Sequence, residues 1–484
     1  MGRVVVAVFD GLQQSQVTRE LMPNLHGLAN EGVTFTNHHC VFPSVTRTNG
    51  SSMVTGRYPG AHGLSGNTVV MRDFDRYRAF SALEPTLKEV AERLGTVLLV
   101  PTLADILSEH GQEYIAVGTG TTGNAYMHNP NAHRSGGATI HPEFTLPYSL
   151  HDEIVGRFGP WPDDSTPNTD RIALSIRVMT EYVIAERDPA VSLIWFSEPD
   201  HVHHAYGVGH PISNAALSAT DAEFGKLLRW LSETGRIDDT DVMVISDHGY
   251  STISEVVDIP GALRDGGFSV GDKPGDIIPA TNGGAVLFYV NGSDQGTTDK
   301  LATWLMEQPW CGALASCGSA EKLPGLIPGR LIGIEGPRAP ELVMSFRWTS
   351  TANDAGYPGT AFASGGAPGV GQHGGMSRRE MNNALYARGP SFKSGITVNV
   401  PTGNVDLTPT ILHVLGLNPE TPMDGRPILE ATKQGPDPND VNWETEIHSA
   451  ERPVNGGVFR QEITLSRVGT TVYVDQGQGR LDTT

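Results

Sequence analysis

Short apolar runs alternate along this chain with longer segments that have a helical period. The runs at residues 4–9, 114–117, 191–196 and 242–245 are almost entirely apolar, which is typical of strands buried on both faces of a sheet. Apolar residues in the segments 103–110, 171–187 and 214–233 recur with the 3.6-residue period of helices packed on a sheet. This alternation predicts an α/β fold, doubly wound around a mostly parallel sheet.

The regular alternation of strand and helix patterns ends after residue 250, where a Gly- and Pro-rich stretch begins. Within this stretch the strand candidates are 285–290 and 342–347, and the helix candidate is 299–306. We interpret residues 251–365 as an inserted α+β cap. The α/β pattern resumes at 384–387 and 405–415, so the expected core comprises residues 1–250 and 366–440. Residues 442–484 alternate like a terminal hairpin, and we expect 441–484 to form a C-terminal β extension.

Three of the expected strands end in acidic residues. VVVAVFDG leads to Asp10, LIWFSEPD to Asp200, and VMVISDHG to Asp247 with His248. Because ligands bind beyond the carboxyl ends of parallel strands, these carboxylates should converge at one edge of the sheet. Such convergence is unfavourable without cations, so the topology predicts a metal site there.

Two further histidines suit the same site. His204 follows Asp200 by one helical turn in DHVHH and has the better spacing, although His201 and His203 lie beside it. His373 lies in GQHGG, where glycines allow the backbone a close approach. A mixed set of carboxylates and imidazoles favours zinc, with manganese and iron as alternatives.

The segment FPSVTRTNG offers a nucleophile. Thr46 stands ahead of an expected helix at 49–55, where the helix dipole and free N–H groups favour a phosphate dianion. A threonine hydroxyl attacks poorly until a metal ion lowers its pKa. The alternative role of Thr46 is an ordinary helix cap.

Taken in order, these motifs resemble the alkaline phosphatase superfamily and, within it, the type I phosphodiesterase/nucleotide pyrophosphatase branch. The resemblance also includes PNLHGLANEGVTFTN, TGRYPGAHG and ARGPSFKSG…NVDLTPTILHVLGL. It covers residues 4–67, 191–250 and 371–427, and it leaves the cap and the tail uncovered.

The resemblance implies two zinc ions and a covalent phosphothreonine at Thr46, which water then hydrolyses. Asn49 matches an asparagine that holds a non-bridging phosphoryl oxygen, and Thr46 would also bridge towards the second ion. The implied ligands are Asp200, His204 and His373 for one ion and Asp10, Asp247 and His248 for the other. We therefore expect a hydrolase of phosphodiester or pyrophosphate bonds.

This chain departs from the branch beside the nucleophile, where Phe-Pro is replaced by Arg47-Thr48 and the usual histidine by Gly50. A phosphonoacetate hydrolase-type enzyme, which cleaves a C–P bond, and a phosphomonoesterase are therefore alternatives. A non-catalytic binding protein of the same fold is disfavoured because all seven key positions are present. Sulfatase relatives are disfavoured because their Cys- or Ser-x-Pro-x-Arg motif is missing at this position.

The candidates for substrate contact are Arg47, as a clamp on a charged oxygen, and residues of the segment 118–134. That segment follows a strand and should open over the same crevice, where Tyr126 and His128, or Asn129 and Arg134, could reach the substrate. The alternative is a glycine-rich surface loop without a binding role.

The amino-acid composition limits the kinds of molecule that the protein is expected to bind. A formal net charge of -20 opposes stable binding of nucleic acid, so the expected substrate is a small molecule bearing phosphate or phosphonate. No apolar run approaches the ~20 residues of a membrane span. The three cysteines cannot all pair, and the chain begins without a signal pattern, so we expect a cytoplasmic protein. A homo-oligomer is compatible with these observations.

Overall fold

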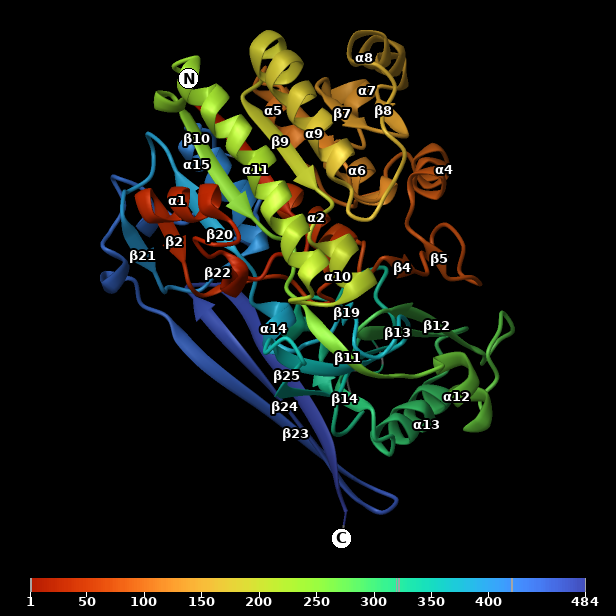
Figure 1. Ribbon diagram of the computed structural model, residues 1–484. Helices are drawn as coiled ribbons and strands as arrows, with labels where there is room; N and C mark the ends of the chain where they lie inside the picture. Colours follow the sequence, from red (N-terminus) through yellow and green to blue (C-terminus); the bar gives the residue numbers. More distant parts are fainter. Residues whose placement is uncertain (1, 319, 321–322, 419–420, 484) are drawn as a thin grey trace.

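The computed structural model describes residues 2–318, 320, 323–418 and 421–483, and a large sheet lies at its centre (Figure 1). Within the described residues this sheet has nine strands, in the order β21-β2-β20-β10-β1-β9-β6-β7-β8. All of them except β20 and β8 run parallel to β1. The strands are β1 Arg3–Phe9, β2 Val33–Phe35, β6 Tyr114–Gly118, β7 Ala138–His141, β8 Phe144–Leu146, β9 Val191–Phe196, β10 Thr240–Ile245, β20 Leu385–Arg388 and β21 Ile396–Val398. The predicted mostly parallel sheet is confirmed.

Helices cover both faces of this sheet. Successive residues of a strand point to opposite faces, and in β1 Val4, Val6 and Val8 enter one hydrophobic core while Val5, Ala7 and Phe9 enter another. The first core contains residues of α2 Thr46–Thr55, α5 Leu103–Glu109 and α15 Leu407–Val414. The second contains residues of α1 Pro23–Glu31, α8 His151–Phe158, α9 Thr169–Val178 with its π-helical continuation Met179–Arg187, and α11 Pro211–Glu233. The doubly wound arrangement is therefore confirmed.

Shorter elements complete the fold around the central sheet. The helices are α3 Pro59–His62, α4 Glu84–Leu94, α6 Thr122–His128, α7 Ala132–Ser135, α10 Asp200–Tyr206 and α14 Arg378–Met381. Two small strand pairs join β3 His38–His39 to β22 Thr402–Gly403, and β4 Thr68–Val69 to β5 Phe80–Ser81. α2 and α6 pack directly against each other, which places the predicted nucleophile segment beside the segment 118–134.

The region interpreted as a cap contains most of two further sheets. The first is built from β11 Ser251–Val256, β17 Trp348–Ala352, β18 Pro358–Ala363 and β19 Gly371–Gln372. The second is built from β12 Ile277–Asn282, β13 Ala285–Val290, β14 Cys311–Ser316, β15 Ile327–Pro328 and β16 Leu342–Phe346, with α12 Ile259–Asp265 and α13 Gln295–Met306 packed on it. β19 pairs with β11 and directly precedes His373, so this region positions one of the predicted ligands. The domain boundaries themselves stay a prediction.

The C-terminal segment forms a long ribbon that runs past β22 and β14 to the end of the chain (Figure 1). A hairpin was expected, but the ribbon has three strands, β23 Glu444–Val454, β24 Gly457–Val468 and β25 Thr471–Thr483. The buried side chain of Gln461 anchors it by bonding the backbone N–H and C=O of Leu314 at 2.7 and 3.0 Å. The third strand, β25, could not be predicted from the two-residue alternation of apolar and polar residues, because its glycines interrupt that alternation.

Two composition-based expectations can be compared with this fold. The three cysteines are buried and unpaired. Within the described parts of the chain, no helix combines the length and apolar character needed to cross a bilayer.

Candidate active site

Three acidic residues meet at the carboxyl edge of the central sheet. Asp10 follows β1 directly, Asp247 follows the neighbouring strand β10, and Asp200 opens α10 just beyond the other neighbour, β9. Two hydrogen bonds tie these ends together, from Asp200 N to Asp10 O at 3.0 Å and from Gly11 N to Asp247 Oδ1 at 2.9 Å. The predicted convergence of the three carboxylates is confirmed.

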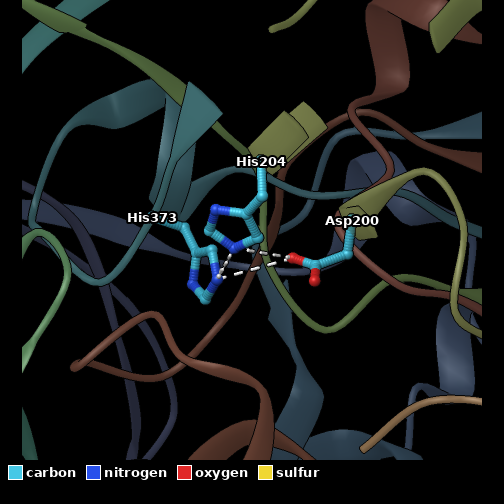
Figure 2. A group of neighbouring side chains, drawn as sticks. All are labelled: Asp200, His204 and His373. Atoms are coloured by element: carbon cyan, nitrogen blue, oxygen red, sulfur yellow. Dashed lines mark hydrogen bonds and ion pairs between the residues drawn. The ribbon is translucent and has the colours of Figure 1, made fainter. Parts of the chain in front are cut away.

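The six predicted ligands form two groups of three. Within each group, one potential ligand atom per residue lies within 4.8 Å of the others, and the groups are Asp200, His204 and His373, and Asp10, Asp247 and His248. Figure 2 shows the first group, in which the Nε2 atoms of His204 and His373 lie 3.4 and 3.5 Å from Asp200 Oδ1. The rings of His248 and His373 stack with centroids 3.6 Å apart, so the two groups adjoin.

Local structure explains how the imidazoles face inward. α10 places Asp200 and His204 on one face, four residues apart. Nδ1 of His373 contacts Ser44 O at 2.8 Å and Nδ1 of His248 contacts Gly249 O at 3.1 Å, so an N–H there leaves the Nε2 lone pair directed into the cluster. Gly374 allows the required approach, because a Cβ there would lie 2.1 Å from a backbone oxygen.

The cluster has more negative charge than its own hydrogen bonds balance. Asp10 Oδ1 and Asp247 Oδ2 are buried and have no hydrogen-bond partner within the described residues. Burial, followed by the charges of Asp247 and Asp200, raises the pKa of Asp10 well above its usual value. Burial also opposes ionisation of Asp200, but His204 and His373 hold the pKa of Asp200 well below its usual value. Carboxylate oxygens without a hydrogen bond, beside inward-facing imidazoles, fit divalent cations, and zinc suits these donor types.

Thr46 lies against the second group. It is the first residue of α2, so the helix begins three residues before the predicted start at Asn49, and Thr46 lies inside the first turn rather than ahead of it. Its Oγ1 is 3.3 Å from Nε2 of His248, and only 6% of the residue is exposed. The hydroxyl thus lies beside His248, whose ring also stacks on His373 of the other group.

Two asparagines near Thr46 differ in their hydrogen bonds. Asn49 is fully buried, its Oδ1 accepts from Val41 N at 2.7 Å, and its Nδ2 donates to the carbonyls of Val41 and Val45 at 3.2 and 3.1 Å. These bonds favour a structural role for Asn49 over the predicted phosphoryl contact. Asn67 instead accepts from Arg47 N at 3.0 Å, and its amide nitrogen has no partner within the described residues.

Sequence reasoning missed Asn67 because it stands far from Thr46 along the chain, at the end of a glycine-rich turn. The only signal was its place at the end of the segment covered by the resemblance. In the structure it lies beside the first turn of α2 with a free amide donor, and it is therefore the better candidate for contact with a phosphoryl oxygen.

Of the other predicted substrate contacts, Tyr126, His128 and Asn129 are buried and Arg134 is exposed. Tyr126 and His128 of α6 are buried, and the ring of His128 packs 5.1 Å from that of Trp195. Burial lowers the pKa of His128 to about 3, so this imidazole is neutral. The Asn129 side chain donates to Gly136 O at 2.9 Å, and the Arg134 side chain donates to Asn131 Oδ1 at 2.6 Å. Contact of these four residues with substrate stays a prediction.

Two unpredicted side chains support the carboxylates. Trp195 Nε1 donates to Asp10 Oδ2 at 2.9 Å, and the Tyr250 hydroxyl donates to Asp200 Oδ1 and, at 3.2 Å, to Asp200 O. Trp195 belongs to an apolar strand and Tyr250 follows the SDHG motif, so neither position indicated a polar role from sequence.

Tyr250→Phe is expected to weaken zinc binding at the Asp200 group about 10- to 100-fold and to leave the Asp10 group nearly unchanged. The reason is that Asp200 loses the donor that orients its carboxylate. Zinc titration against a competing chelator resolves the two affinities. Tyr114→Phe is the matched control, because the buried Tyr114 hydroxyl has no hydrogen-bond partner among the described residues. Equal weakening at both groups would contradict an orienting role for Tyr250.

Comparison with known proteins shows a matching family model and several similar proteins. Residues 4–374 match the family model described as type I phosphodiesterase / nucleotide pyrophosphatase. A bis(5'-adenosyl)-triphosphatase from mouse is 24% identical over 432 residues, which are 86% of this chain and 78% of the relative. The corresponding protein from cattle is 23% identical over 424 residues, covering 86% of this chain and 79% of the relative.

Solved structures show the same fold. An inactive variant of murine ectonucleotide pyrophosphatase / phosphodiesterase 5 in complex with AMP aligns with a TM-score of 0.62 at 19% identity, over 88% of this chain and 97% of the other. Human ectonucleotide pyrophosphatase / phosphodiesterase 5 aligns with a TM-score of 0.60 at 16% identity, over 89% of this chain and 100% of the other.

Proposed function

Because this chain belongs to the type I phosphodiesterase/nucleotide pyrophosphatase family, we propose that it hydrolyses phosphodiester or pyrophosphate bonds through a covalent intermediate on Thr46. The observation that carries this proposal is the contact of the Thr46 hydroxyl with His248, 3.3 Å away, at the junction of two ligand groups. Asp200, His204 and His373 would hold one zinc ion, and Asp10, Asp247 and His248 the other. Manganese and iron are the alternatives for these donors.

Bound metal ions would lower the pKa of the hydroxyl and offset charge on the phosphoryl oxygens. The Thr46 hydroxyl releases its proton to solvent and its oxygen attacks phosphorus, the bond from phosphorus to the leaving group breaks, and a Thr46 phosphoester forms. The first turn of α2 and the free amide of Asn67 face the negative oxygens. A water then attacks the same phosphorus, the bond to Thr46 breaks, and the hydroxyl regains its proton.

The substrate is proposed to be a small molecule that bears phosphate. The name of the mouse relative and the AMP complex of the murine structure support a nucleotide substrate. Hydrolysis of phosphonoacetate is the second candidate, because Arg47 places a cation beside the nucleophile where it could bind a carboxylate. A phosphomonoesterase is the third.

A substrate panel tests the proposal. With zinc added, kcat/KM is expected to be at least about tenfold higher for bis-p-nitrophenyl phosphate than for p-nitrophenyl phosphate or phosphonoacetate. Release of p-nitrophenolate measures the first two, and release of inorganic phosphate the third. A preference for phosphonoacetate would assign the chain to C–P bond hydrolysis, and a preference for the monoester would make it a phosphomonoesterase.

A further inference from the structure

Arg47 is buried without an acidic partner. The residue is 6% exposed, Nη1 donates to the main-chain oxygen of Asn67 at 3.2 Å, and Nε has no partner within the described residues. No ion pair of the described residues includes it. A buried guanidinium in this state is costly, and proteins usually balance it with a carboxylate or an anionic ligand.

The guanidinium lies at the junction of α2 and α6. A Cβ on Gly123 would lie 2.8 Å from Arg47 Nε, so the glycine leaves room for the side chain against α6. Two more buried polar atoms of α6 lack partners among the described residues, Oδ1 of Asn124 and Nδ1 of His128. Asn124 Oδ1 lies against α2, since a Cβ on Gly50 would be 2.3 Å from it, and only Arg47 among these three residues is charged.

This cation is close to the nucleophile but separate from it. Consecutive helix residues point about 100° apart, so the long side chain of Arg47 extends beside Thr46 rather than over its hydroxyl. Asn67 contacts Arg47 twice, accepting from its backbone N–H through Oδ1 and from its guanidinium through the main-chain oxygen. Burial lowers the pKa of Arg47 to about 10, against the charges of Asp10 and Asp200, so the side chain stays protonated at neutral pH.

We propose that Arg47 is a specificity residue that binds a second anionic group of the substrate, attached next to the phosphorus that Thr46 attacks. This inference rests on the proposed function. The ligand groups and Asn67 face the transferred phosphoryl group, whereas the planar fork of Arg47 suits two oxygens of a neighbouring phosphate or carboxylate. Two substrate classes present this chemistry, the organic pyrophosphates and the phosphonocarboxylates.

Arg47→Met tests the proposal with a matched pair of nucleotides. Hydrolysis of P1,P2-di(adenosine-5') diphosphate is expected to lose about 100-fold in kcat/KM, because its second phosphate loses a charged partner. The p-nitrophenyl ester of AMP has no second anion and should lose less than about threefold. Phosphonoacetate is the third arm, and a selective loss there would identify the carboxylate as the natural anion.

Equilibrium binding separates this inference from the catalytic proposal. In a Thr46→Ala background loaded with zinc, calorimetry compares ADP with AMP. The added Arg47→Met change is expected to weaken ADP about 100-fold and AMP by less than about threefold. This readout needs no turnover, so it tests Arg47 even if Thr46 proves not to be the nucleophile.

Two variants serve as controls. Arg171→Met removes another buried arginine, which lies 3.4 Å from Asp164 and 3.8 Å from Glu143, and it should leave the ratio between the two nucleotides unchanged. Arg47→Lys keeps the charge without the fork and should lose about tenfold on the diphosphate alone. It also serves if Arg47→Met does not fold.

The proposal is overturned by either of two results. Equal losses on the diphosphate, the nucleotide ester and p-nitrophenyl phosphate would mean that Arg47 contacts the transferred phosphoryl group. Unchanged kinetics and binding with a lowered Tm would mean that Arg47 only supports the fold.

Discussion

Thr46→Ala is expected to reduce kcat by at least about 10⁴-fold while two metal ions stay bound, because the variant keeps all six carboxylate and imidazole ligands and lacks only the attacking oxygen. The hydroxyl lies 3.3 Å from His248 Nε2, at the start of α2. Turnover of bis-p-nitrophenyl phosphate and metal content by mass spectrometry are measured on the same sample.

Thr46→Ser is the matched variant, since it keeps a hydroxyl at the same position and should retain measurable turnover. Acid quenching of the parent during turnover should yield a peptide containing residue 46 with the added mass of the phosphoryl group, and this peptide should be unmodified in Thr46→Ala. Turnover near the parent rate in the alanine variant would remove Thr46 from the mechanism.

Asp247→Asn should cost one equivalent of bound metal and at least about 10³-fold in kcat. The side chain keeps its shape and its Oδ1 can still accept from Gly11 N, but an amide nitrogen in place of Oδ2, which lies 3.1 Å from His248 Nε2, cannot bind a cation. Chelation of the metal should also reverse which of the two proteins, parent or variant, has the higher Tm. The metal-free variant should have a higher Tm than the metal-free parent, because Asp10 loses a buried like charge beside it.

Asp241→Asn is the control on the same strand. Asp241 is also buried, but it lies at the opposite end of β10, where Oδ1 accepts from Ser391 N at 2.9 Å. Its substitution should leave metal content unchanged. Two bound equivalents and full activity in Asp247→Asn would contradict the assignment of the Asp10 group as a metal site.

The candidate site divides clearly between what was predictable and what was not. Asp10, Asp200 and Asp247 could be placed together because each follows an apolar strand, and the ends of parallel strands share an edge. The one-turn spacing of Asp200 and His204 is likewise a local property. Asn67, Tyr250 and Trp195 could not be assigned, because nothing near them in the chain reveals which side chain their polar atoms face.

The amino-acid sequence by itself determined the class of fold and the convergence of the acidic strand ends, and the family resemblance predicted which carboxylates and imidazoles form each of the two groups. Apolar periodicity sets which segments become buried strands and packed helices, and motif order places acidic residues at strand ends. The start of α2 at Thr46 and the third C-terminal strand lay outside this information, because helix ends and glycine-rich strands depend on the contacts they make.

Only the tertiary structure decided which polar groups are already satisfied. Asn49 and Asn67 have the same side chain. The loop before α2 hydrogen-bonds both polar atoms of the Asn49 side chain, whereas the amide nitrogen of Asn67 has no partner within the described residues. Arg47 was a candidate clamp from its position alone, whereas its burial without a carboxylate emerges only when α2 packs on α6. Hydrogen bonding and burial depend on neighbours that are distant in the chain, and for that physical reason the fold had to decide them.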